Sequence, residues 1–344
     1  HHLDMATINY PSSRLARSVL DLIGDTPLLQ LPRLPEMLGI PSGSLFAKVE
    51  SVNPGGSKKD RVAKRIIEDA RLTGRLLPGQ PVVELTSGNT GTGLAITCRA
   101  LGHEFHAVMS EGNTPERAKA MRAMGATVHL VPQHAGSKIG QVSGEDLDLV
   151  EKAAKKLTEE NGYFRADQFS EEGSWTCHFE GTAPEIWQQS DGEIDGFVDF
   201  VGSGGTFVGC AAYFVGQSGR IKNYVIEPEN AVVLARSAGG TGAHSIQGGG
   251  YNKGFDDLPV FDSCLANRGL TPAQLITGGF LTVSDEEAIK MCRLLAREEG
   301  IFGGFSAGAN LAKAVEVVRR GECKKVAFIV CDTGQKYFST GLWT

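Results

Sequence analysis

The strongest constraint on the fold is an alternation of short apolar runs with amphipathic stretches along most of the chain. In the first half, we predict strands over 81–85, 105–109 and 127–131, with helices over 91–101, 114–125 and 147–161. The second half repeats this rhythm, with strands over 196–201, 222–226 and 325–330, and helices from about 206, over 285–299 and over 310–320. Such alternation predicts mostly parallel α/β sheets, and two series predict two domains with a cleft between them.

Length and composition agree with a globular protein of this kind. The chain has 344 residues, of which 41% are hydrophobic and 22% charged, which suits one large or two moderate domains. The net charge of −6 comes without a basic stripe, so we expect no nucleic-acid partner. No apolar run reaches membrane-spanning length, and no secretory pattern opens the chain, so we expect a cytoplasmic protein without membrane contact.

The seven cysteines are scattered and odd in number. None forms a C-x-x-C pair, and none is spaced with histidine as a metal site requires. We therefore expect reduced thiols and no metal site.

A turn that opens a helix carries the most unusual lysine of the chain. It reads Asn53-Pro54-Gly55-Gly56-Ser57-Lys58-Lys59-Asp60-Arg61. Ser57 can cap the helix, and a lysine in the first turn meets the positive end of the helix dipole. That position lowers the pKa of the lysine, as a Schiff-base lysine requires. Taken alone, the motif fits a solvated surface turn better.

Three further loops follow strands, where ligands collect in α/β proteins. Thr86–Gly91 and Gly202–Thr206 each lie between a strand and a helix, and their N–H groups, glycines and hydroxyls suit a carboxylate or a phosphate. Gly202–Thr206 lacks the third glycine of a dinucleotide fingerprint and the Gly-Lys-Ser/Thr of a P-loop. The loop Asp332–Tyr337 follows the last strand. Plain tight turns remain the alternative for each loop.

Taken in order, these motifs resemble the cysteine synthase / cystathionine β-synthase family of fold type II pyridoxal-phosphate (PLP) enzymes, which includes 2,3-diaminopropionate synthase. Each motif is weak alone, but the ordered set is specific. The resemblance runs from Ile23–Leu28 through the motifs above to Asp332–Thr340. It implies a two-domain, tryptophan synthase β-like α/β fold with the active site between the domains. Residues 10–50 and 165–344 would form the larger, phosphate-binding domain, and residues 51–164 a smaller, mobile domain that closes on substrate. It also implies a homodimer.

The resemblance also implies a role for individual residues. Lys59 matches the Schiff-base lysine, Asn89 the residue that binds the cofactor 3′-oxygen, and Thr333 the hydroxyl residue that faces the pyridine nitrogen. The phosphate cup would consist of Gly202, Ser203, Gly204, Gly205 and Thr206. The substrate would be bound by Thr86, Ser87, Gly88, Thr90, Gln168 and Gly248.

The implied reaction is β-replacement on an O-activated L-serine, O-acetylserine or O-phosphoserine, in amino-acid biosynthesis. The leaving group departs to give an aminoacrylate, a second nucleophile adds to Cβ, and Lys59 moves the Cα proton. A neutral hydroxyl at Thr333 does not hold the pyridine nitrogen protonated as an aspartate would. The ring is then a weaker electron sink, which suits β-elimination better than transamination.

Three positions depart from the family pattern and leave the second substrate open. Lys58 precedes the anchor where an apolar residue is usual, Arg165 adds charge before Gln168, and Gly249 replaces a bulky apolar residue. One hypothesis is a larger, charged acceptor, such as an amino acid whose nitrogen attacks Cβ. Drift at solvent-facing positions explains these residues equally well.

Other activities also remain open. A lyase or dehydratase that releases pyruvate would use the same chemistry. A dinucleotide-binding oxidoreductase and a catalytically silent binding protein are the alternatives from other classes.

Overall fold

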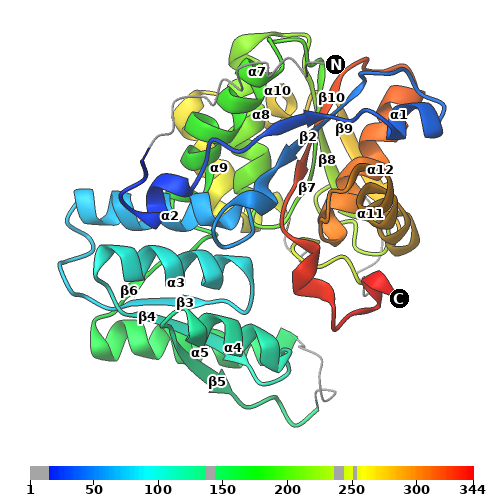
Figure 1. Cartoon of the computed structure of the whole chain (residues 1–344). Helices are drawn as coiled ribbons and strands as arrows, with labels where there is room; N and C mark the ends of the chain where they lie inside the picture. The colour runs from blue at the N-terminus through cyan, green and yellow to red at the C-terminus, as the bar shows by residue number, and fades with distance from the viewer. Residues whose placement is uncertain (1–14, 137–143, 236–243, 251–253) are drawn as a thin grey trace, which may run out of the picture.

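The computed structural model describes residues 15–136, 144–235, 244–250 and 254–344, and contains two open sheets flanked by helices (Figure 1). The six-stranded sheet has the order β1 (Leu28–Gln30), β2 (Leu45–Val49), β10 (Val326–Val330), β7 (Gly196–Phe200), β8 (Lys222–Pro228) and β9 (Gly279–Val283). All its neighbours are parallel except β1 and β2. The four-stranded sheet has the parallel order β5 (Thr127–Val131), β4 (Phe105–Ser110), β3 (Val82–Leu85) and β6 (Phe164–Arg165). The predicted α/β fold class is confirmed.

Helices cover both faces of each sheet. Around the smaller sheet lie α3 (Asn89–Leu101), α4 (Pro115–Ala123) and α5 (Gly144–Asn161). The larger sheet packs α11 (Asp285–Glu299) and α12 (Phe305–Arg319) on one face, and α7 (Ala183–Gln189), α8 (Gly205–Gln217) and α9 (Pro259–Arg268) on the other. Three further helices are short: α1 (Leu34–Met37), α6 (Gly173–Cys177) and α10 (Pro272–Leu275).

Helix α2 (Lys59–Leu72) follows a strand of the larger sheet but packs beside the smaller one (Figure 1). Its apolar residues Val62, Ile66 and Ala70 recur at helical spacing and are fully buried. The first turn lies so close to α3 that a Cβ on Gly93 would stand 2.9 Å from the Lys59 carbonyl oxygen. Glycine at that position therefore lets the helix that begins at Lys59 approach its neighbour.

A buried charge network anchors the first turn of α2. Arg61 donates from Nε and Nη2 to the two carboxylate oxygens of Glu50, at 2.8 and 2.9 Å. Its Nη1 lies 2.6 Å from Glu185, which also pairs with Lys48 at 2.6 Å. Burial raises the pKa of Glu50, but the Arg61 guanidinium outweighs it and holds this pKa below its ordinary value. The network ties α2 to β2 and α7.

The differences from the sequence prediction include strands β1, β2 and β9, which were not predicted, and several element boundaries. Helix α12 begins at Phe305 rather than at 310, because Ser306–Ala309 continue the helix. Strand β6 adds 164–165 to the smaller sheet, beside the expected domain boundary. The expected start of the larger domain at residue 10 lies outside the described residues. Within the described residues, no helix is both long and apolar enough to cross a membrane.

Candidate active site

Lys59 lies where loops from both sheets meet, and within the described residues the hydrogen bonds of its amine go to neutral side chains. Its Nζ donates to Gln168 Oε1 at 2.9 Å and to Ser203 Oγ at 3.1 Å. Thr90 donates to the same Gln168 oxygen at 2.7 Å. The fold thus brings together the predicted anchor, two predicted substrate residues and the predicted phosphate cup.

The environment of Lys59 favours the neutral amine. Burial, followed by the neighbouring Lys58 ammonium, lowers the pKa of Lys59 to about 8. The predicted direction is confirmed, although burial rather than the helix dipole is the leading cause. A lysine with this pKa is an effective nucleophile and base near neutral pH.

The loop that precedes α3 is stabilised by hydrogen bonds to the side chain of its own residue Thr86. Thr86, only 6% exposed, accepts hydrogen bonds on its hydroxyl oxygen from the N–H groups of Gly91, at 3.0 Å, and Gly88, at 3.4 Å. Ser87 Oγ accepts from Arg117 Nη1 at 3.2 Å. Thr86 therefore shapes the loop, while the N-terminus of α3 remains suited to an anion.

Asn89 is oriented by the segment that follows β10. Its Nδ2 donates to Asp332 Oδ2 at 2.7 Å, and its Oδ1 accepts from Lys336 Nζ at 2.5 Å. Tyr337 also donates to Asp332 Oδ2, at 2.6 Å, and Lys336 donates to the Gly55 carbonyl at 2.8 Å. Burial raises the pKa of Asp332. The sequence analysis assigned no role to Asp332 or Lys336.

Thr333 lies against the turn that precedes Lys59. Its N–H donates to the Gly56 carbonyl at 3.0 Å, and its hydroxyl oxygen accepts from the Gln335 N–H at 3.4 Å. Gly56 has a φ of +71°, and a Cβ there would stand 2.9 Å from Thr333 Cγ2. The turn therefore requires glycine, and it places Thr333 close to the start of α2.

The Gly202–Thr206 loop ends at the first turn of α8. Gly204 has a left-handed φ of +90°, and a Cβ on Gly205 would lie 2.2 Å from the Ser174 carbonyl oxygen. A Cβ on Gly202 would lie 2.4 Å from the carbonyl oxygen of Gly248, the remaining predicted substrate residue. The backbone packs tightly on both sides and presents a helix N-terminus, as a phosphate cup requires.

The three departures from the family pattern have partners within the fold. Lys58 Nζ pairs with Asp199 at 3.3 Å, and Arg165 pairs with Glu84 at 3.1 Å and Glu151 at 2.9 Å. A Cβ on Gly249 would stand 2.5 Å from the Val201 carbonyl oxygen. Each of the three residues is thus engaged within the fold, and their effect on the choice of second substrate stays a prediction.

Asp199 is a second buried carboxylate, besides Asp332, to which the sequence alone assigned no role. It lies in β7, and Asn310 of α12 donates to it at 3.4 Å. An aspartate within the apolar run Gly196–Phe200 was the available signal, because a buried carboxylate needs a partner.

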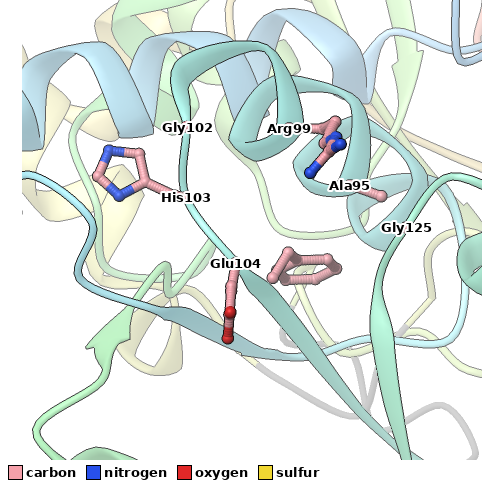
Figure 2. Close-up of a pocket in the computed structure, with 7 residues that line it drawn as sticks. Ala95, Arg99, Gly102, His103, Glu104 and Gly125 are labelled. Carbon is pink, nitrogen blue, oxygen red and sulfur yellow. The ribbon is translucent and has the colours of Figure 1, made fainter.

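A hollow of about 160 Å³ lies elsewhere on the molecule, as Figure 2 shows. It is lined by Ala95, Arg99, Gly102, His103, Glu104, Phe105 and Gly125. These residues surround the amino end of β4, whereas the loop at Thr86–Gly91 follows the carboxyl end of β3. The hollow therefore belongs to the opposite edge of the smaller sheet.

The residues around Lys59 fit PLP. A partly buried lysine without an acidic partner among the described residues suits the aldehyde, and the glycine loop at a helix N-terminus suits a phosphate. Asn89 and Thr333 are linked to the turn that precedes Lys59. Thr333 donates to the Gly56 carbonyl, and Asn89 contacts Lys336, which donates to the Gly55 carbonyl.

Comparison with known proteins agrees with this fit. The family model described as pyridoxal-phosphate dependent enzyme matches residues 19–332. The chain is 38% identical to O-ureido-L-serine synthase of Streptomyces lavendulae, over 96% of this chain and 93% of that protein. It is 34% identical to cysteine synthase of Staphylococcus aureus, over 95% and 97% respectively.

A solved structure shows the same fold. The crystal structure of O-acetyl serine sulfhydrylase isoform 3 from Entamoeba histolytica superposes with a TM-score of 0.82 at 30% identity, covering 98% of this chain and 94% of that one. The family resemblance and the cofactor are confirmed, and the dinucleotide-binding alternative is wrong. The chain belongs to the family of pyridoxal-phosphate-dependent enzymes.

Proposed function

We propose that this enzyme catalyses β-replacement on an O-activated L-serine, either O-acetylserine or O-phosphoserine. The observation that carries the proposal is the contact of Lys59 with both Gln168 and Ser203, because it joins anchor, substrate loop and phosphate cup. Relatives named cysteine synthase and O-ureido-L-serine synthase cover nearly the whole chain and support this reaction class.

Bound PLP supplies an aldehyde that links to an amine and an electron sink for the negative charge that develops at Cα. Lys59 holds the cofactor, then as a free amine takes the Cα proton and later returns it. Thr90 and Gln168, already hydrogen-bonded to each other, bind the substrate α-carboxylate with the N–H groups of the Thr86–Gly91 loop. The Gly202–Thr206 loop holds the cofactor phosphate, and Asn89 its 3′-oxygen.

Sulfide is the leading acceptor, and an amino-acid nitrogen is the alternative. Lys58, Arg165 and Gly249 give the nitrogen alternative no direct support, since each is engaged in contacts within the fold. One relative is nevertheless named for O-ureido-L-serine rather than for cysteine, so acceptors other than sulfide belong in the test. Release of pyruvate without any acceptor would identify a lyase.

The first experiment tests the anchor. The wild-type protein should be yellow and absorb near ~410 nm with PLP bound, and Lys59→Ala should be colourless and inactive. Lys119→Ala, at an exposed position on α4, is the control and should keep both properties. A colourless wild type that does not respond to added PLP would contradict the proposal.

The second experiment identifies the reaction. Each serine donor is supplied alone, with sulfide, with hydroxyurea, and with aspartate or glutamate, and products are identified by mass. Cysteine formed fastest supports the leading acceptor, and a β-amino-substituted alanine formed fastest supports the nitrogen alternative. Pyruvate as the dominant product in every mixture would replace β-replacement by elimination.

We further propose that residues 51–164 move as a unit against the remainder and that the enzyme is a homodimer. Arg117 of α4 donates to Gln247 beside the predicted substrate residue Gly248, a contact that such a movement would break and remake. Hydrogen exchange with and without substrate tests the movement, and light scattering after size exclusion tests the dimer. Unchanged exchange in 51–164, or a monomer mass, would reject the respective statement.

A further inference from the structure

Two adjacent lysines at the start of α2 have opposite surroundings. Lys58 Nζ lies 3.3 and 3.4 Å from the two carboxylate oxygens of Asp199. Lys59 Nζ has hydrogen bonds only to Gln168 and Ser203, and forms no ion pair within the described parts of the chain. One lysine is therefore held as a cation, and its neighbour has no anion to hold it charged.

The ion pair of Lys58 is fixed inside the protein. The side chains of Lys58 and Asp199 are only 11% and 2% exposed. Asn310 donates to Asp199 Oδ1 at 3.4 Å and accepts from the Phe200 N–H at 2.7 Å, which fixes both ends of its own amide. Burial opposes the charge on Lys58, but Asp199 outweighs it and raises the pKa of Lys58 above its ordinary value. The charge persists across the working pH range.

The other titratable groups that face Lys59 are neutral near pH 7. Burial raises the pKa of Cys177, on α6, to about 12 and that of Cys331, after β10, to about 11. Burial also lowers the pKa of His178 well below its ordinary value. Lys58 and Asp199 are therefore the charges that act on Lys59 at neutral pH.

We propose that Lys58 is a positioning residue for the anchor: its ammonium is fixed on Asp199 of β7, the Lys59 amine binds Ser203 just after the same strand, and the ammonium keeps Lys59 in the unprotonated form that binds the cofactor and accepts a proton. Like charges disfavour each other's protonated form, and the burial of Lys58 limits screening by solvent. The start of a helix adds to the effect, since its partial positive charge acts on the same amine. This inference rests on Lys59 as the anchor, but not on which acceptor the enzyme uses.

The test measures the protonation of Lys59 without relying on turnover. The cofactor-free chain is labelled with fluorodinitrobenzene across pH 6–11, and mass spectrometry follows the rate at Lys59. The variants are Lys58→Met, which removes the charge, Lys58→Arg, which keeps it, and Lys58→Met/Asp199→Asn, which removes both charges. The pH profile of kcat/KM is recorded for the same variants with PLP bound.

The wild type and Lys58→Arg should both titrate near pH 8. In Lys58→Met the midpoint should rise by about one pH unit, which slows labelling at pH 7 about tenfold. The double variant should fall between them, because the lost carboxylate offsets part of the lost ammonium. The acidic limb of kcat/KM should move the same way.

The inference is overturned if Lys58→Met keeps the wild-type midpoint, or if Lys58→Arg shifts as far as Lys58→Met. The double variant keeps the test decisive where the single variant folds poorly, since it leaves no unpaired buried charge. If the labelling midpoints shift as expected but no β-replacement product forms, this inference is supported and the proposed function is rejected. Failure of the inference and failure of the proposed function are therefore distinguishable.

Discussion

Asn89 and Asp332, far apart in the sequence, are joined by a 2.7 Å hydrogen bond from the amide to the carboxylate. Lys336 holds the other end of the same amide at 2.5 Å. The orientation of Asn89 is thus imposed by residues that follow β10. Because Asn89 is the predicted ligand of the cofactor 3′-oxygen, we expect Asp332 and Lys336 to determine which of its atoms faces the cofactor.

Replacing Asp332 should therefore weaken PLP binding. Asp332→Ala leaves the Asn89 and Tyr337 donors without their acceptor, a loss of about 1–3 kcal/mol that corresponds to about 5- to 150-fold in affinity. Asp332→Asn should retain most of the affinity, since one amide oxygen can accept both bonds. Absorbance titration of the cofactor-free protein with PLP measures this, with the exposed Asp262→Asn as control. Equal affinity in Asp332→Ala and wild type would refute the assignment.

Glu50→Gln should destabilise the fold strongly. It removes the charge that pairs with buried Arg61, and breaking such a pair costs about 3–5 kcal/mol. Glu159→Gln, in the exposed pair with Lys155, should cost less than about 1 kcal/mol. Urea unfolding at pH 7 compares the two, and similar losses would show that the buried network contributes little.

The Glu50 effect should also depend on pH. The pKa of Glu50 is lower in the folded protein than its ordinary value of 4.5, so its ionisation stabilises the fold above that pH. This contribution is lost as the pH falls from 4.5 through the folded value. The stability gap between wild type and Glu50→Gln should consequently narrow in acid, and a gap that widens there would contradict the assigned sign.

In the cofactor-free protein, Lys59 should make the free energy of unfolding rise with pH between about 8 and 10.5. Its pKa is about 8 when folded against an ordinary 10.5, so the unfolded chain binds more protons between these values and stability rises with pH across that window. The full change is roughly 3 kcal/mol. Urea unfolding of wild type and Lys59→Met between pH 7 and 10.5 isolates the effect. A stability difference that stays constant with pH would place the folded pKa at its ordinary value.

Gly249→Ala should destabilise the fold without changing the preference of the enzyme among acceptors. Its Cβ would stand 2.5 Å from the Val201 carbonyl oxygen and 2.6 Å from the Phe200 ring. We expect a loss of about 1–3 kcal/mol in stability and an equal fall in activity with every acceptor. Gly216→Ala, in α8 with open space around it, is the matched control and should be neutral or slightly stabilising. A selective gain with one acceptor would restore a specificity role.

Local pattern was sufficient for the strands and helices that have clear periodicity and end signals. Helix α11 has its serine cap, its amphipathic repeat and its terminal Gly300, and its bounds agree with the prediction. Strands β1, β2 and β9 were missed, because short apolar runs of this kind do not by themselves show whether they pair as strands. Helix α12 was started late because the small residues of Ser306–Ala309 lack an apolar repeat, although they pack closely against α11.

The candidate site, like the fold, could be predicted from the sequence only in part. The loops around Lys59 lie together as the ordered motifs predicted, since each follows the end of a strand. The partner of Lys58 was out of reach, because the Lys58–Asp199 pair joins residues that only the folded sheet brings together. Lys58, the charged residue beside the anchor, was therefore interpreted as a possible substrate contact, whereas its ammonium pairs with Asp199 in the interior.

The bridges that join Ser57 to Asp332 and Gly303 to Thr333 also bear on how the enzyme is made. Lys59 leaves the ribosome long before residues 332–337, so a nascent chain carries the anchor lysine while the segment that orients Asn89 does not yet exist. Early encounters with PLP would give only a loose, reversible adduct. Capture in the correct orientation must wait until translation has passed β10, which makes cofactor loading a late event in the maturation of this protein.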